Sequence, residues 1–192
     1  MRALAAALAL AAAVSCAGRH PAASMPPGTG PLVGLYRASI ADPEGRVRKL
    51  KLLLWAQAPD RIHAELLGPV GGVRLTVDAG PGAAAVIDHE SAIAYAGVPS
   101  PDDVRRLVGV PLAVPALVEA LLSGTKPDGL RVERVGAPGL PERFTVAGGG
   151  GTLTLELVHL TRGSDAAAAL GTGAPPPAMT VRPLEEWEAA ER

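Results

Sequence analysis

Alternation of apolar and polar side chains is the feature of this sequence that most restricts its fold. The apolar members of the two clearest runs are Ile62, Ala64 and Leu66, followed by Val73, Leu75 and Val77. A period of two predicts β-strands with one buried and one solvent-facing side, as in antiparallel sheets. We expect about ten strands, mostly in hairpin order and separated by Gly, Pro and Asp turns. The other runs lie at 32–41, 46–56, 83–88, 92–96, 130–135, 142–147, 152–157 and 178–183.

Two segments depart from this period and are typical of short helices. The first begins after Ser100, a residue suited to the N-cap, has Asp103 in the capping-box position, and ends before Gly109. The second starts near Pro115 and ends before Gly124. Strands, a helical pair and further strands predict an α+β fold. We expect a curved antiparallel sheet, an open half-barrel of about ten strands, covered by these two helices inserted mid-chain.

The first 15 residues have the layout of a secretory signal peptide. Arg2 supplies the positive start, and residues 3–14 form an apolar run that is shorter than the roughly 20 residues needed to cross a bilayer. The segment 13–16, Ala-Val-Ser-Cys, resembles the lipobox of bacterial lipoproteins, which implies that Cys16 becomes the acylated N-terminus. A plain secreted protein with an incidental cysteine is the alternative. A single cysteine excludes a disulfide within the chain.

Composition indicates one domain with an aliphatic interior. Hydrophobic residues make up 48% of the chain but aromatic residues only 3%, so a buried interior is lined mainly by Ala, Val and Leu. The formal net charge of −1 gives no indication of nucleic-acid binding. We expect a signal peptide at 1–15, a lipidated N-terminus and Pro/Gly-rich tether at 16–31, one domain at 32–183, and a short helix or tail at 184–192.

The stretch from Leu52 to Gly124 contains an ordered series of segments: LLLWAQ, PDRIHAELL, GPVGG, VRLTVDAGPG and AGVPSPDDVRRLVGVPLAVPALVEALLSG. This series resembles the LolB family of bacterial outer-membrane lipoprotein receptors and, more distantly, the periplasmic carrier LolA. The resemblance implies an open half-barrel around an apolar cavity. In the family this cavity takes the acyl chains of another lipoprotein from the carrier, and the receptor then releases that lipoprotein into the outer membrane. It also implies a lipid-anchored, periplasm-facing protein.

The resemblance assigns roles to particular residues. Val70, in the turn Gly68-Pro69-Val70-Gly71, takes the place of an apolar side chain that contacts membrane or cargo, and a scattered surface valine is the alternative. An acyl-chain cavity is expected between the apolar strand faces and the second helix. Its predicted lining is Leu50, Leu52, Leu54, Trp55, Ile62, Ala64, Leu66, Val73, Leu75, Val77, Leu117 and Leu121. An ordinary filled core at these positions is the alternative, with Trp55 packed under the helices.

Catalytic and metal-binding patterns are not evident in the sequence. The four histidines, His20, His63, His89 and His159, lie far apart and lack metal-ligand spacing. The glycine run at 147–152 lacks the Lys-Ser/Thr ending of a phosphate loop, and there is no G-x-S-x-G elbow.

We therefore expect a monomeric, non-enzymatic protein without a cofactor. Its partners would be acylated lipoproteins or lipids, a LolA-like carrier, and the membrane that holds its N-terminal lipid. The alternative is an envelope scaffold or interaction lipoprotein with the same fold and a filled core.

Overall fold

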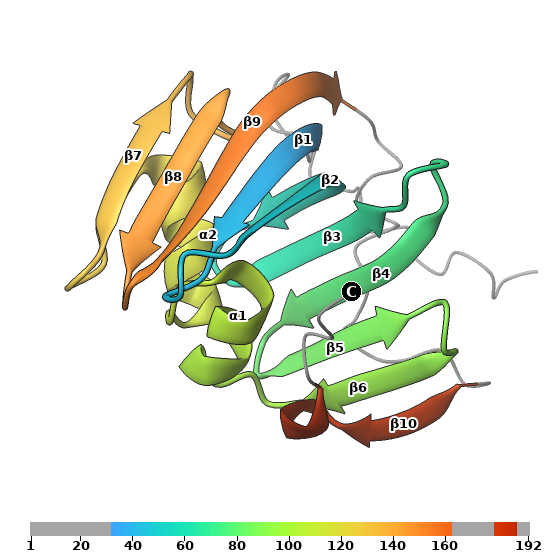
Figure 1. Ribbon diagram of the computed structural model, residues 1–192. Helices are drawn as coiled ribbons and strands as arrows, with labels where there is room; N and C mark the ends of the chain where they lie inside the picture. Colours follow the sequence, from blue (N-terminus) through green and yellow to red (C-terminus); the bar gives the residue numbers. More distant parts are fainter. Residues whose placement is uncertain (1–31, 163–178, 188–192) are drawn as a thin grey trace, which may run out of the picture.

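The structure is a computed structural model that describes residues 32–162 and 179–187. In these residues ten strands form one sheet that does not close, and the sheet curves around two short helices on its inner side (Figure 1). The predicted fold class, an open curved sheet covered by two helices inserted mid-chain, is confirmed.

The elements follow the predicted boundaries closely. The strands are β1 (Leu32–Ala41), β2 (Val47–Gln57), β3 (Arg61–Leu67), β4 (Val73–Gly80), β5 (Ala83–Asp88), β6 (Ile93–Gly97), β7 (Arg131–Val135), β8 (Arg143–Gly148), β9 (Gly151–Arg162) and β10 (Thr180–Pro183). The helices are α1 (Pro101–Val108), α2 (Val114–Ser123) and the 3-10 helix η1 (Leu184–Glu186).

The sheet consists of two meanders joined at one long-range pairing. Strands β1 to β6 follow one another antiparallel in chain order, and so do β7 to β9. The two sets meet where β1 pairs antiparallel with β9, with Ala38 opposite Leu155. The strand order is therefore β10-β6-β5-β4-β3-β2-β1-β9-β8-β7.

One edge of the sheet departs from the antiparallel prediction. Strand β10 pairs with β6 in parallel, with Val181 beside Ala94. A hairpin forces its two strands to run antiparallel, whereas strands far apart in the chain are free to pair in either direction. Since β10 follows β6 only after both helices and three strands, its direction is not set by a turn. The sheet is consequently mixed.

The helix caps predicted from the sequence are present. The Ser100 hydroxyl accepts a hydrogen bond from the Asp103 backbone N–H, and the Asp103 carboxylate accepts one from the Ser100 backbone N–H at 2.8 Å. Gly109 ends α1 with φ of 82°, a left-handed conformation that favours glycine. Gly124 ends α2 in the same way. These caps fix where each helix begins and ends.

A filled core occupies the part of the sheet formed by β1 and β7 to β9. Tyr36, Phe144 and Val146 from the sheet are fully buried in one cluster with Val118 of α2. The Tyr36 hydroxyl donates a hydrogen bond to the Pro141 carbonyl at 2.7 Å. Burial raises the pKa of Tyr36, so this hydroxyl stays protonated and remains a donor.

Several sequence predictions fall outside the described residues. These are the signal peptide, Cys16 and the tether up to residue 31, together with the end of the tail at 188–192. Within 32–162 and 179–187, no helix has the length and apolar character needed to cross a membrane.

Candidate functional site

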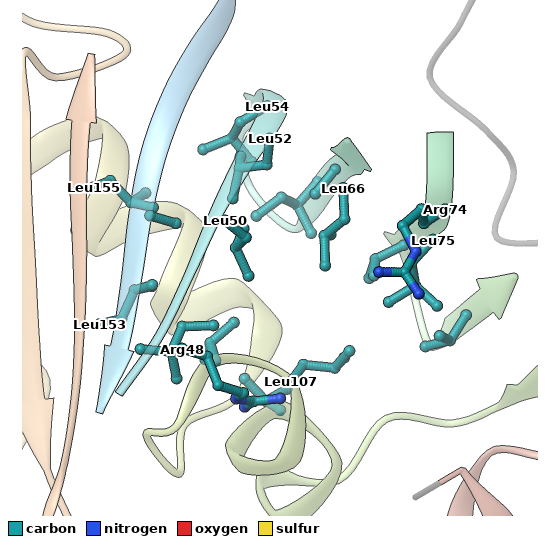
Figure 2. Close-up of a pocket in the computed structure, with 18 of the residues that line it drawn as sticks. Arg48, Leu50, Leu52, Leu54, Leu66, Arg74, Leu75, Leu107, Leu153 and Leu155 are labelled. Carbon is teal, nitrogen blue, oxygen red and sulfur yellow. The ribbon is translucent and has the colours of Figure 1, made fainter. Parts of the chain in front are cut away.

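A cavity of about 1410 Å³ lies on the inner face of the sheet, beneath the two helices. Its wall comes from β1 to β6 and β9, with α1, α2 and η1 at its margins. Figure 2 shows leucine side chains from β2, β3, β4 and β9 converging on this space. The volume exceeds the range of about 300–1,000 Å³ that is usual for sites of drug-sized ligands. The cavity therefore has room for a ligand larger than a drug-sized molecule.

Most of the predicted lining residues border this cavity. They are Leu50, Leu52, Leu54, Ile62, Ala64, Leu66, Leu75, Val77, Leu117 and Leu121. Several of them, including Leu50, Ile62 and Leu66, remain half-buried, although they lie in the interior of the sheet. Since the cavity is a space open to solvent, these side chains are only partly covered by other side chains.

Strand register explains why these side chains meet. One row across the sheet pairs Leu54 with Ala64, Ala64 with Val77, and Val77 with Val86. Directly opposed residues on neighbouring strands point to the same face and lie within contact distance. The period of two therefore builds one continuous aliphatic wall.

Val73 does not line the cavity, so that prediction is wrong. The pairing of β3 with β4 shifts between Leu66 and Leu67: Leu66 lies opposite Leu75, while Leu67 lies opposite Val73. One residue of β4, Arg74, is therefore extra, as in a β-bulge. A bulge reverses the alternation beyond it. Val73 consequently leaves the face of Leu75 and is exposed.

Trp55 is also absent from the cavity wall and does not pack under the helices. It follows Leu54 in β2, and successive residues of a strand point to opposite faces. Trp55 is buried on the outer face of the sheet, where its ring lies 3.9 Å from the ring of His63, centroid to centroid. Its indole Nε1 has no hydrogen-bond partner among the described residues.

His63, next to Trp55, belongs to a polar cluster on the outer face. Its Nδ1 pairs with the Asp78 carboxylate, and its Nε2 lies 3.3 Å from Glu65 Oε1. Both ring nitrogens thus face carboxylate oxygens. In the described part of the chain, no group of three or more His, Cys, Asp or Glu side chains could hold a metal ion. These contacts link three polar side chains of β3 and β4 on the outer face.

Charged side chains at the cavity were missed by the sequence analysis. Arg48 lies on the same face of β2 as Leu50, and its Nη2 is 3.5 Å from the Arg106 carbonyl of α1 (Figure 2). Arg74 donates hydrogen bonds to both carboxylate oxygens of Glu90, at 2.7 and 2.8 Å, and this pairing raises the pKa of Arg74. Arg48 could have been found from its even spacing with the leucines. Arg74 could not, because only the bulge brings it there.

The C-terminal part of the described chain completes the wall. Leu184 and Trp187 are buried and border the cavity. Arg106 of α1 donates to the backbone carbonyls of Glu185 and Trp187, at 2.8 and 2.9 Å. The last described residues are therefore tied to the helix that lies over the sheet.

Val70 lies at the tip of the β3–β4 turn, and its side chain is 99% exposed. Its neighbours Gly68 and Pro69 border the cavity. The turn is held by a hydrogen bond from the Gly68 N–H to the Gly72 carbonyl at 2.7 Å, and Gly71 takes a left-handed φ of 91°. Among the described residues, the most exposed large apolar side chain is thus next to two residues that border the cavity.

Comparisons with known proteins leave the family open. No protein-family model matches the chain, and no curated protein matches it. Among solved structures, it is similar to the crystal structure of an uncharacterized conserved protein from Thermus thermophilus, with a TM-score of 0.45 and 12% sequence identity. That similarity covers 80% of this chain and 90% of the Thermus chain.

Proposed function

We propose that this protein binds the acyl chains of lipoproteins or lipids in the inner-face cavity, and that it helps to insert lipoproteins into the outer membrane. It would be anchored there through Cys16, facing the periplasm, and would receive its cargo from a LolA-like carrier. This proposal joins the sequence resemblance to the LolB family with the geometry of the cavity. It requires no catalytic group and no cofactor.

The aliphatic cavity is the observation that carries the proposal. The hydrocarbon part of an acyl chain has no polar group that would need a hydrogen-bond partner. A wall of Leu, Val, Ile and Ala side chains is therefore sufficient to bind it. Burying each methylene contributes about 0.8 kcal/mol, so one long chain gains roughly 10 kcal/mol from full transfer out of water. Half-buried lining residues such as Ile62 and Leu66 would gain burial from the same event.

A ligand titration tests this function directly. Residues 17–192 contain every described residue and omit the signal peptide and Cys16. We expect this chain to bind an environment-sensitive fluorescent fatty acid, and a triacylated lipopeptide to displace it. The unacylated form of the same peptide should not displace it.

Two variants that each introduce a glutamine in place of an aliphatic residue locate the binding site. Leu66→Gln removes apolar surface from the cavity wall, and we expect it to weaken fatty-acid binding by about tenfold or more. Val158→Gln makes a comparable change at an exposed position of β9 and should leave binding unaltered. No binding by the unsubstituted chain would instead favour a scaffold lipoprotein that uses its outer surface.

The exposed tip is expected to act during delivery rather than during binding. Val70→Glu places a charge on a side chain that contacts no described core residue, so stability should stay within about 0.5 kcal/mol. We expect this variant to bind the lipopeptide normally and to transfer it to vesicles more slowly. Unchanged transfer would remove the assigned role of Val70.

Anchoring through Cys16 has a separate test. In cells fed labelled palmitate, the full chain should incorporate the label and the Cys16→Ser chain should not. Label retained by Cys16→Ser would contradict lipidation at this site. Two or more acyl chains are needed for stable membrane attachment.

A further inference from the structure

Three basic side chains lie side by side on the outer face of β1 and β2. We call Arg37, Lys49 and Lys51 the basic cluster. Arg37 is directly opposite Lys51 in the β1–β2 register, and Lys49 precedes Lys51 by two positions in β2, on the same face. All three residues are exposed, while the intervening Leu50 turns to the inner face. The cluster therefore presents three positive charges to solvent from two adjacent strands.

Neighbouring acidic side chains contact other residues. Glu156 lies opposite Arg37 across the β1–β9 pairing, but its ion pair is with Arg143 at 3.4 Å. Glu65, which lies opposite Leu53 in the β2–β3 pairing, has its Oε1 3.3 Å from His63 Nε2. Within the described residues, no salt bridge reaches the basic cluster. Like charges directly opposite each other on adjacent strands are destabilising. The cluster therefore does not stabilise the fold, and an external anion would relieve its repulsion.

The position of the cluster indicates what that anion is. Lys51 lies opposite Leu67, the last residue of β3, and the turn that carries Val70 begins at the next residue. The positive charges and the most exposed apolar tip consequently share one end of the sheet. An apolar element flanked by basic residues is typical of a protein surface that binds an anionic membrane.

We propose that the basic cluster binds the phosphate groups of an anionic phospholipid bilayer and docks this end of the sheet on the membrane surface. The three residues border the cavity, but strand alternation places their side chains on the face opposite Leu50 and Leu52, so the anion would bind outside the cavity. This site extends the proposed function, because docking here would bring the β3–β4 turn and the cavity margin at Gly68 and Pro69 to the bilayer. An acidic protein is the rival partner.

Vesicle sedimentation with residues 17–192, which lack the acylated cysteine, tests the proposal. The chain should bind phosphatidylcholine vesicles that contain phosphatidylglycerol and bind pure phosphatidylcholine vesicles far less. Each basic residue near an anionic surface changes the binding affinity by about fivefold. We therefore expect vesicle affinity to fall by roughly a hundredfold in the triple variant Arg37→Gln/Lys49→Gln/Lys51→Gln. Added salt should weaken binding of the unsubstituted chain, because it screens these charges.

A second triple variant controls for net charge. Lys126→Gln/Arg131→Gln/Arg182→Gln also removes three exposed positive charges, from positions in or beside β7 and β10 at the two edges of the sheet. This variant should retain most of the vesicle binding. Equal losses of vesicle binding in the two triple variants would overturn the proposal. Equal binding of the unsubstituted chain to both vesicle types would also overturn it. Either result would favour an acidic protein as the partner of the basic cluster.

The fatty-acid titration separates this proposal from the proposed function. The cluster variant should bind the fluorescent fatty acid as the unsubstituted chain does, which also shows that it is folded. Loss of vesicle binding with intact fatty-acid binding supports the docking site. If the unsubstituted chain binds vesicles but no fatty acid, the docking site stands and the acyl-binding function fails.

Discussion

The two parts of the sheet use their inner faces differently. In the part formed by β1 and β7 to β9, the filled part, large side chains such as Tyr36 and Phe144 are fully buried, and only β1 and β9 reach the cavity. In the part formed by β2 to β6, the open part, the inner face borders the cavity, and side chains such as Ile62 and Leu66 remain half-buried. Both parts have the same alternation of apolar and polar residues.

Side-chain volume, rather than period, distinguishes the two parts. The single phenylalanine of the chain lies in the filled part, beside a tyrosine whose hydroxyl is bonded to Pro141. In the open part the central row is built from Ala64, Val77 and Val86. Small side chains on a curved sheet leave space that two short helices do not fill. A binding cavity thus arises from a core that is locally under-packed.

The largest difference between the two parts should appear when a side chain is truncated. Phe144→Ala should lower the free energy of unfolding by about 3–5 kcal/mol, because it leaves a void in a closed core. Leu66→Ala, at a half-buried position beside an existing cavity, should cost less than about 2 kcal/mol, below the usual range for closed cores. Urea unfolding monitored by circular dichroism measures both values.

Equal costs for these two substitutions would break the comparison. That result would mean that Leu66 is as tightly packed as Phe144 in solution, and that the cavity is closed by rearrangement of the helices. The titration of the unsubstituted chain with fatty acid would then be expected to fail as well.

Enlarging a side chain should also cost more in the filled part than in the open part. Val146→Phe forces extra volume into the filled part and should cost about 1–3 kcal/mol. Val77→Phe adds the same volume to the open part, where the cavity can accept it, so stability should change by less than about 1 kcal/mol. Val77→Phe should nevertheless weaken fatty-acid binding, since it occupies the binding space. A large stability loss in Val77→Phe would argue against an open cavity.

A smaller effect concerns α1, which lies over the open part. Burial of Asp103 acts to raise its pKa, but hydrogen bonds from Ser100 and the Arg106 guanidinium outweigh burial, so the pKa of Asp103 is lowered. A lowered folded-state pKa contributes stability that is present above the usual Asp pKa of about 3.9 and is lost as the pH falls through the lowered value. We expect Asp103→Asn to cost about 1 kcal/mol at neutral pH and less in acid.

Thermal melts across this pH range measure the effect, and Asp102→Asn is the matched control. Asp102 is the preceding residue of α1 but is exposed, and it pairs only with Arg105, at 3.2 Å, so its loss should matter little. A cost for Asp103→Asn that is equal at neutral and acid pH would contradict the ionic role of Asp103.

The sequence predicts the elements of this fold better than their packing. Alternation and capping residues are local signals, so the strands, and the helix ends at Ser100, Gly109 and Gly124, follow from them directly. The bulge at Arg74 depends on how β3 pairs with β4, which no local pattern records. Val73 was misplaced for this reason.

The candidate site was predictable only in part. Leu50, Leu52 and Leu54 alternate in the sequence and line the cavity, but the same spacing would also describe a filled core. Trp55 is predicted at the cavity although it breaks the alternation of β2, and the structure places it on the outer face beside His63. The direction of β10 was unpredictable, since no turn connects it to β6.

The pairing of β1 with β9 has a consequence for how the chain folds. Hairpins within each meander close loops of a few residues, whereas Ala38 and Leu155 must find each other across more than a hundred intervening residues. Contacts between distant parts of a chain form slowly, because the entropy of closing the loop is lost before the contact is gained. Until β9 pairs with β1, the aliphatic face of strands β1 to β6 is not yet enclosed by the rest of the cavity wall. During folding this apolar face is accordingly exposed until the long-range pairing forms, which makes it a site for misassociation.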